Sequence, residues 1–255
     1  MSAPAVGPRV EVHADADAAR RSAAALIAEL LSARGERGAV LALPTGETPR
    51  GVYAELVRRH RDEGLSFRHA TTFGLDEFWT LSRGHPHGFW RFLDEHLLGR
   101  VDSDPARRFH LDGGAPEDRA AEACALYEAA IAEVGGLDLA LLGLGTNGHI
   151  AFNEPGSPRD SRTRRVTLHD SSRVDLARLF GGADAVPKEA LTMGVDTILA
   201  AREVVLLALG ARKAPAVARM LGGPIGPDCP ASFLREHPRA LVVLDREAAA
   251  ELRSG

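Results

Sequence analysis

The chain has 255 residues, of which 45% are hydrophobic and 26% charged, as in a globular protein with a sizeable core. The net charge is −4 and no basic run stands out, so we expect no nucleic-acid partner. The N-terminal stretch MSAPAVGPRVEVH lacks the charged start and apolar core of a signal peptide, and no apolar run is long enough to cross a membrane. The two cysteines, Cys124 and Cys229, form neither a disulfide framework nor a metal-ligand spacing. We therefore expect a cytoplasmic protein that uses no membrane and no metal.

The chain begins with a strand and a helix. Alternating residues from 9 to 13 predict an edge strand. Alanines and leucines then recur at helical spacing, with Asp15 or Asp17 as the N-cap and Gly35 at the helix end. Residues 39–43 follow as a buried strand.

The second strand runs directly into Pro44-Thr-Gly-Glu-Thr-Pro-Arg50. Thr48 followed by Pro49 suits the N-cap and first turn of a helix. A strand, a Thr/Gly turn and a helix N-terminus together present free backbone N–H groups to an anion, which favours a phosphate. A plain strand-to-helix turn is the alternative, and the Gly-Lys-Ser/Thr ending of a Walker loop is missing.

A third strand, residues 70–75, ends in Asp76 and Glu77. Adjacent acids at a strand end are commonly surface features, but aromatic residues follow this pair closely. Trp79, Phe89 and Trp90 pack either over a cleft or on the face of the next helix, residues 89–98, and we favour the helix face.

The stretch LDLALLGLGTNGHIAFNEP, residues 137–155, carries the strongest chemical signal. Residues 137–142 predict a buried strand, after which Gly143, Gly145 and Gly148 let the backbone turn sharply. Asn147, His149 and Glu154 lie on this turn. Ligands of parallel α/β sheets sit beyond the carboxyl ends of the strands, so we predict a catalytic edge here.

The region after Glu154 is polar and basic and predicts a lid over residues 157–187. Arg173 and Arg178 lie on a predicted helix with Asp170 or Ser171 as its cap. We expect most of these arginines to be solvated surface charges.

A further strand, residues 204–209, leads through Gly210 to Lys213 at a helix start. The helix dipole disfavours a cation there, and a bound phosphate would explain the lysine. A short helix at 230–236, a strand at 240–244 and a terminal helix complete the chain. About seven short apolar strands alternate with helices, which predicts a single α/β domain over residues 1–255, with a doubly wound, mostly parallel sheet.

Several collinear segments together resemble the glucosamine-6-phosphate deaminases, also called glucosamine-6-phosphate isomerases. The matching segments are LPTGETP at 43–49, FGLDEF at 73–78, GLGTNGHIAFNEPGS at 143–157, SRTRRVTL at 161–168, VPKEALTMGVDTIL at 186–199, LALGARKA at 207–214 and CPASFLREHP at 229–238. The GHIAFNEP segment is highly specific, because related lactonases share the glycine-histidine turn but not the Phe-Asn-Glu-Pro.

The resemblance implies a Rossmann-like sugar-phosphate isomerase fold that converts glucosamine 6-phosphate to fructose 6-phosphate and ammonia without a metal or an organic cofactor. It implies that Asp76 is the enolisation base and that Asn147, His149 and Glu154 open the sugar ring. The implied phosphate contacts are Thr45, Gly46, Glu47, Thr48, Arg178 and Lys213.

Two departures from the family pattern shape our expectations. Asn147 stands where many members carry Asp, and it can orient its neighbours but cannot act as a base. Val166 stands where allosterically regulated members carry a basic residue, and the chain ends soon after its last predicted helix. We therefore expect no allosteric activation by an acetylated sugar phosphate, and a monomer or small homo-oligomer.

Two alternative functions follow from the same residues. One is a 6-phosphogluconolactonase-like hydrolase of the same superfamily, against which Asp76-Glu77 and the segment 152–155 count. The other is a non-catalytic sugar-phosphate sensor, but the first strand begins near residue 9 and leaves no room for a helix-turn-helix before it.

Overall fold

A central parallel sheet of seven strands organises the computed structural model, which describes residues 7–252. Residues 1–6, which belong to the stretch in which we expect no signal peptide, and residues 253–255 lie outside the described part. The strands are β1 (Arg9–His13), β2 (Val40–Leu43), β3 (Thr71–Gly74), β5 (Arg108–Phe109), β6 (Leu139–Gly143), β9 (Glu203–Ala208) and β10 (Ala240–Asp245). Their spatial order is β1-β10-β9-β6-β2-β3-β5, and every pair is parallel. This confirms the predicted doubly wound α/β fold.

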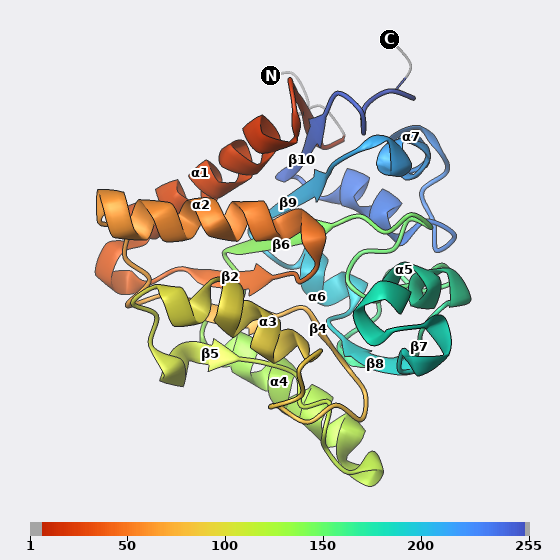
Figure 1. Cartoon of the computed structure of the whole chain (residues 1–255), viewed down its shortest axis with the longest axis horizontal. Coiled ribbons are helices and arrows are strands. Elements are labelled where there is room, and N and C mark those ends of the chain that lie inside the picture. Colours follow the sequence, from red (N-terminus) through yellow and green to blue (C-terminus); the bar gives the residue numbers. More distant parts are fainter. Residues whose placement is uncertain (1–6, 253–255) are drawn as a thin grey trace.

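Helices cover both faces of this sheet (Figure 1). The α-helices outside the lid region are α1 (Ala16–Arg34), α2 (Glu47–Glu63), α3 (Phe89–His96), α4 (Ala120–Glu133), α6 (Val195–Leu199) and α7 (Ala214–Gly222). Short 3-10 helices are η1 (Gly35–Arg37), η2 (Leu98–Arg100), η3 (Pro105–Arg107), η4 (Glu117–Arg119), η5 (Ala183–Ala185), η6 (Ala211–Lys213) and η7 (Pro230–Glu236). Successive strand residues point to opposite faces, so Leu41 packs with α1, α2 and α3, whereas Ala42 packs with α4, α6 and α7.

The strand order reverses direction between β2 and β6. From β2 the chain builds outward through β3 to β5, and from β6 it builds the other way through β9 to β10. The carboxyl ends of β2 and β6 therefore border the crevice in which doubly wound folds bind their ligands. The loop after β9, which carries Lys213, flanks β6 on its other side.

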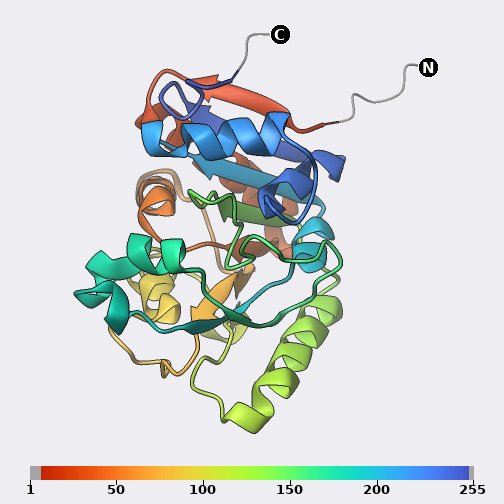
Figure 2. The same ribbon diagram turned by 90° about the vertical axis from the view of Figure 1, so that its right-hand side faces the viewer.

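A small antiparallel sheet and one helix form a second layer at this edge. The sheet contains β4 (Asp76–Phe78), β8 (Glu189–Thr192) and β7 (Arg164–Thr167) in the order β4-β8-β7, and α5 (Asp170–Phe180) follows β7. Figures 1 and 2 show α5 and this sheet beside the central sheet, at the edge toward which β2 points. The predicted lid region thus contains regular structure.

Four phenylalanines, which we call the aromatic cluster, hold α5 in place. Phe78 of β4 lies 5.1 Å from Phe180 of α5 between ring centroids, and 5.6 Å from Phe152 after the β6 turn. Phe89 of α3 packs against both Phe78 and Phe152. The cluster therefore joins the strand that carries Asp76, the turn that carries His149, and the lid helix.

Three local predictions about the strand and helix boundaries are wrong. Asp76 and Glu77 do not end the third strand, because the chain leaves β3 at Gly74 and pairs with β8 instead. Thr48 is not the N-cap of α2, because Gly46 with φ 101° occupies that position. The cap of α5 is neither Asp170 nor Ser171 but His169, whose Nδ1 accepts the Ser171 N–H.

The predicted terminal helix is also absent from the described residues, where turns follow β10. In this segment the Asp245 carboxylate accepts the backbone N–H groups of Gly210 and Ala248. Within residues 7–252, no helix is both long and apolar enough to traverse a bilayer.

Asp138 lies just before β6, at the opposite edge of the sheet, and its contacts give a stability prediction. Its buried carboxylate accepts the Val40 N–H at 2.9 Å and pairs with Arg34 and Arg202. We expect Asp138→Ala to lower the free energy of unfolding by about 3 kcal/mol, because it leaves a buried N–H unpartnered and removes the carboxylate that Arg34 and Arg202 share. Urea unfolding measures the loss, and Asp138→Asn, which keeps an acceptor, should lose less. Equal stability of the alanine variant and the wild type would contradict this role.

Candidate active site

A tight turn after β6 presents the histidine of the predicted site. Gly145 donates its N–H to the carbonyl of His149 at 2.9 Å, and Gly148 adopts φ 93°. The imidazole packs directly on Gly145, where an added Cβ would lie 2.3 Å from ring atoms. Only glycine fits there, so this backbone approach fixes where the His149 ring lies.

Asn147, His149 and Glu154 lie together, as the sequence predicted. Asn147 donates Nδ2–H to Glu154 Oε2 at 2.7 Å and accepts the His149 backbone N–H at 3.1 Å. His149 Nδ1 lies 3.3 Å from the same Glu154 oxygen. Burial raises the pKa of Glu154, but hydrogen bonds from His149, Ser172 and Asn147 outweigh it and lower the pKa below its usual value. Glu154 is therefore an anion at neutral pH, although it is buried.

Adjacent acids on β4 have different environments. Glu77 is buried and accepts the backbone N–H groups of Phe78, Phe89 and Trp90, two of which belong to the start of α3. It therefore caps a helix and holds structure. Asp76 has no hydrogen-bond partner for its carboxylate among residues 7–252. Burial, and to a smaller extent the neighbouring Glu77, raises the pKa of Asp76 to about 8.

Contacts within the fold connect Asp76 to the histidine turn. Asp76 pairs with Thr192 across β4 and β8, and the Thr192 hydroxyl accepts the Phe152 N–H at 3.1 Å. The buried amide of Asn153 donates to the carbonyl of Met193 at 2.8 Å. One network of strand pairing and hydrogen bonds therefore carries Asp76 and the 147–154 segment at the same edge of the sheet.

Lys213 has Asp175 of α5 as a charged neighbour, and Asp175 in turn contacts the loop after β6. Asp175 accepts hydrogen bonds from Arg212 and from the Thr146 hydroxyl, each at 2.9 Å. Burial lowers the pKa of Lys213, the neighbouring Asp175 opposes this, and Arg212 lowers it further. A half-buried ammonium in this position favours a bound anion, which would restore its usual pKa.

The other predicted phosphate contacts are arranged more loosely. Thr45 and Gly46 form the loop between β2 and α2, on the β2 side of the crevice, and Glu47 and Thr48 lie in the first turn of α2. Arg178 is exposed on α5. Within residues 7–252, no hydrogen bond or ion pair joins Arg178 to the loop or to Lys213.

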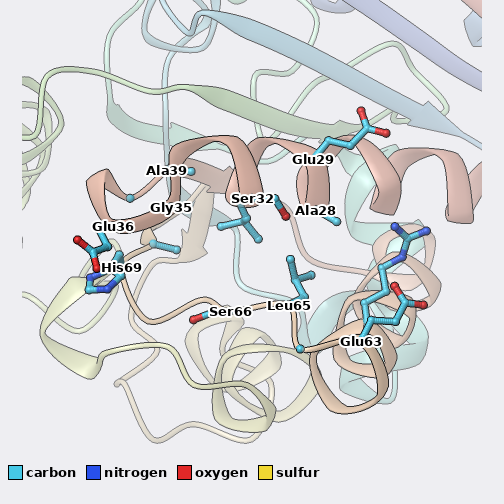
Figure 3. A pocket seen from close by; sticks show the side chains of 15 residues that line it. Ala28, Glu29, Ser32, Gly35, Glu36, Ala39, Glu63, Leu65, Ser66 and His69 are labelled. Carbon is cyan, nitrogen blue, oxygen red and sulfur yellow. The ribbon is translucent and has the colours of Figure 1, made fainter.

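A pocket of about 650 Å³ lies at the other edge of the sheet (Figure 3). It is lined by the C-terminal ends of α1 and α2 and includes Glu29, Glu36 and Glu63. None of the predicted site residues lines it. Helix C-termini repel anions, and three carboxylates face one arginine, Arg59, in the lining, so this pocket does not suit a phosphorylated substrate.

Sequence reasoning missed the contribution of the first turn of α5 to this site. The Ser171 hydroxyl accepts a hydrogen bond from Asn147 at 3.2 Å, and the Ser172 hydroxyl lies 3.3 Å from His149 Nδ1. The His169 N–H points to Glu154 Oε1 at 3.4 Å. Serine and histidine at a helix start read as capping residues in sequence, so no local signal indicated these contacts.

The raised pKa of Asp76 gives a stability prediction with a definite sign. Between its ordinary pKa of 3.8 and about 8, the native protein holds a proton that the unfolded chain releases, so this aspartate destabilises the fold increasingly as pH rises. We expect Asp76→Asn to be as stable as the wild type near pH 4 and more stable by on the order of 3–5 kcal/mol at pH 9. Urea unfolding of both proteins across this pH range tests the prediction. A stability difference that does not depend on pH would show that the Asp76 carboxyl is exposed to water.

Comparison with known proteins identifies the family. A family model described as glucosamine-6-phosphate isomerases/6-phosphogluconolactonase matches residues 13–243. The glucosamine-6-phosphate deaminase of Rhodopirellula baltica is 47% identical over 243 residues, or 95% of each chain. Glucosamine-6-phosphate deaminase 1 of Bacillus subtilis is 46% identical over 212 residues, or 83% of this chain and 87% of that protein.

Solved structures agree with this assignment. A monomeric glucosamine-6-phosphate deaminase superposes with a TM-score of 0.92 at 40% identity, covering 95% of this chain and 99% of that one. The 6-phosphogluconolactonase of Trypanosoma brucei has a TM-score of 0.76 at 24% identity, covering 98% and 100%, and shares the fold. This chain belongs to the family of glucosamine-6-phosphate isomerases and 6-phosphogluconolactonases.

Proposed function

We propose that this protein is an enzyme that converts glucosamine 6-phosphate and water to fructose 6-phosphate and ammonia. The observation that carries the proposal is that an aspartate of raised pKa, without a hydrogen-bond partner among residues 7–252, lies at the same sheet edge as a histidine–carboxylate pair. Relatives that match nearly the whole chain are named for this reaction. The reaction belongs to the breakdown of amino sugars.

The first step is ring opening, for which His149 is suitably placed. Its Nδ1 faces the Glu154 carboxylate, which can only accept a hydrogen bond, so the proton resides on Nδ1. Nε2 then has a free lone pair that accepts the proton of the anomeric hydroxyl and returns it to the ring oxygen. Glu154 stabilises the imidazolium that forms between the two transfers. Asn147 is neutral and orients both partners.

The second step moves a proton from C2 to C1 of the open sugar. Asp76 accepts the C2 proton, because a carboxylate whose pKa lies near the operating pH is a stronger base than an ordinary aspartate. The electron pair left at C2 forms the C1–C2 double bond while the aldehyde oxygen at C1 takes a proton from the C2 ammonium, which gives the enolamine. Asp76 then returns its proton to C1. This leaves an imine at C2, which water hydrolyses to the ketone and ammonia. Proton transfers and the addition of water account for the whole reaction, so the scheme uses no metal and no organic cofactor.

The phosphate anchors the substrate away from the reacting carbons. Lys213 supplies a half-buried positive charge, and residues Thr45 to Thr48 supply backbone N–H groups at the start of α2. Arg178 reaches the phosphate by a movement of its exposed side chain on α5. Binding energy gained at the phosphate positions C1 and C2 against Asp76.

We also infer the setting in which the enzyme works. It acts in the cytoplasm as one domain, residues 1–255, with residues 157–187 as a lid over a small sugar phosphate, and it needs no nucleic acid or membrane. One similar structure is of a monomeric deaminase, which supports a monomer or small homo-oligomer here. The lactonase alternative rests on relatives that share the fold at lower identity.

A coupled assay for fructose 6-phosphate tests the reaction. We expect Asp76→Asn to abolish turnover of glucosamine 6-phosphate while substrate binding, measured by calorimetry, survives, because an amide cannot take the C2 proton. Full kcat in this variant would place the base elsewhere. A wild type that yields no product at millimolar substrate would overturn the deaminase, and hydrolysis of a phosphorylated sugar lactone would then favour the lactonase.

Lys213→Ala should mainly raise KM. Losing one charge-assisted contact to the phosphate costs about 1.5–3 kcal/mol, or about 10- to 100-fold in KM, with a smaller loss in kcat. The chain's other lysine, Lys188, is exposed and provides the matched control, since Lys188→Ala removes the same charge. A KM unchanged in Lys213→Ala would show that the phosphate binds without this lysine.

A further inference from the structure

The hydroxyl group of Ser172 lies inside the hydrogen-bond network of the candidate site. Ser172 belongs to the first turn of α5 in the lid region, and its side chain is buried. Its Oγ lies 3.3 Å from His149 Nδ1, and the hydroxyl lies close enough to the Glu154 carboxylate to help lower the pKa of that group. A hydroxyl that contacts both members of the histidine–carboxylate pair influences both.

The donors and acceptors of this group have one consistent arrangement. Glu154 can only accept, so the Ser172 hydroxyl donates to it, and His149 Nδ1–H is then shared between the Glu154 oxygen and the serine oxygen. If the imidazole carried its proton on Nε2 instead, Nδ1 would present a lone pair to an anionic carboxylate. The serine therefore supports the tautomer that leaves Nε2 free for the substrate.

We propose that Ser172 is a positioning residue for ring opening, which holds the His149 imidazole in its Nδ1–H form against Glu154. The inference rests on the proposed deaminase function and adds a residue of the lid helix to its machinery. Ser172 acts through His149 and does not itself exchange a proton with the sugar.

Contacts at both ends of α5 fix the position of Ser172 relative to His149. At the far end of the helix Phe180 packs on Phe78 in the aromatic cluster and lies 4.9 Å from the His87 ring. At the near end the His169 N–H and the Ser171 hydroxyl contact Glu154 and Asn147. Because both ends are held, Ser172 reaches His149 only while the helix is seated. The lid therefore completes the histidine site.

Steady-state kinetics of Ser172→Ala tests the proposal. We expect kcat for glucosamine 6-phosphate to fall about 10- to 100-fold, as for a misplaced catalytic group, while KM changes less than about twofold. Ser172→Thr keeps the hydroxyl and should recover most of kcat, whereas Ser172→Val, of the same shape without the hydroxyl, should not. The threonine–valine pair decides the question even if the alanine variant does not fold.

Ser103 provides the matched control for loss of a buried serine hydroxyl. Its Oγ donates to the Leu98 carbonyl at 2.8 Å, and it precedes β5 toward the other edge of the sheet. Ser103→Ala should lose stability but keep kcat. Equal kcat in the threonine and valine variants at position 172 would overturn the proposal.

The imidazole nitrogen shifts of ¹⁵N-labelled protein provide a readout that does not depend on turnover. We expect His149, assigned by loss of its signal in His149→Gln, to carry its proton on Nδ1 in the wild type and to become a tautomer mixture in Ser172→Val. Identical His149 signals in the two proteins would overturn the role of Ser172. If the wild type shows the Ser172-dependent tautomer but deaminates no substrate, the proposed reaction fails while the positioning role stands.

Discussion

The buried carboxylate of Glu154 is the constraint around which the site is arranged. An anion in this position is tolerated only if hydrogen bonds replace the water it has lost, and its partners come from two parts of the chain. His149 and Asn147 approach from the turn after β6, and Ser172 approaches from α5. Satisfying one carboxylate therefore joins the turn after β6 to α5, and removing any partner disturbs the others.

Asp76 and Glu77 show how neighbouring side chains of one chemical type acquire different roles. The alternation of β4 directs Glu77 to the start of α3, where it accepts two backbone N–H groups of that helix in addition to the N–H of Phe78. Asp76 points the other way and receives no such donors, so burial raises its pKa toward 8. The fold is destabilised by this aspartate at high pH, and the destabilised carboxylate is the basic group that the proposed proton transfer needs. The hydrogen bonds of Glu77 to the start of α3 hold β4 in place, and they therefore also hold Asp76, which has no such partners among the described residues.

Most of the fold and much of the site were predictable because they depend on local patterns. Short apolar strands, the glycines after β6 and the acidic pair at 76–77 are all visible in sequence. What failed depends on contacts between distant segments. The pairing of β4 with β8 takes Asp76 away from β3, and the backbone of Gly46 displaces Thr48 from the cap. Ser172 was missed for the same reason, since a serine in the first turn of a helix normally indicates only where that helix begins.

The aromatic cluster turns these separate segments into one unit. Its rings come from β4, α3, the segment after the β6 turn and α5, so each contributes burial that the others need. Phe78 follows the acidic pair directly, and Phe152 lies two residues before Glu154. A shift of α5 would expose Phe180 and withdraw Ser172 at the same time. The packing of α5 in the aromatic cluster and the contact of Ser172 with His149 therefore depend on the same helix. This is why Ser172, which lies outside the central sheet, is held close to the imidazole.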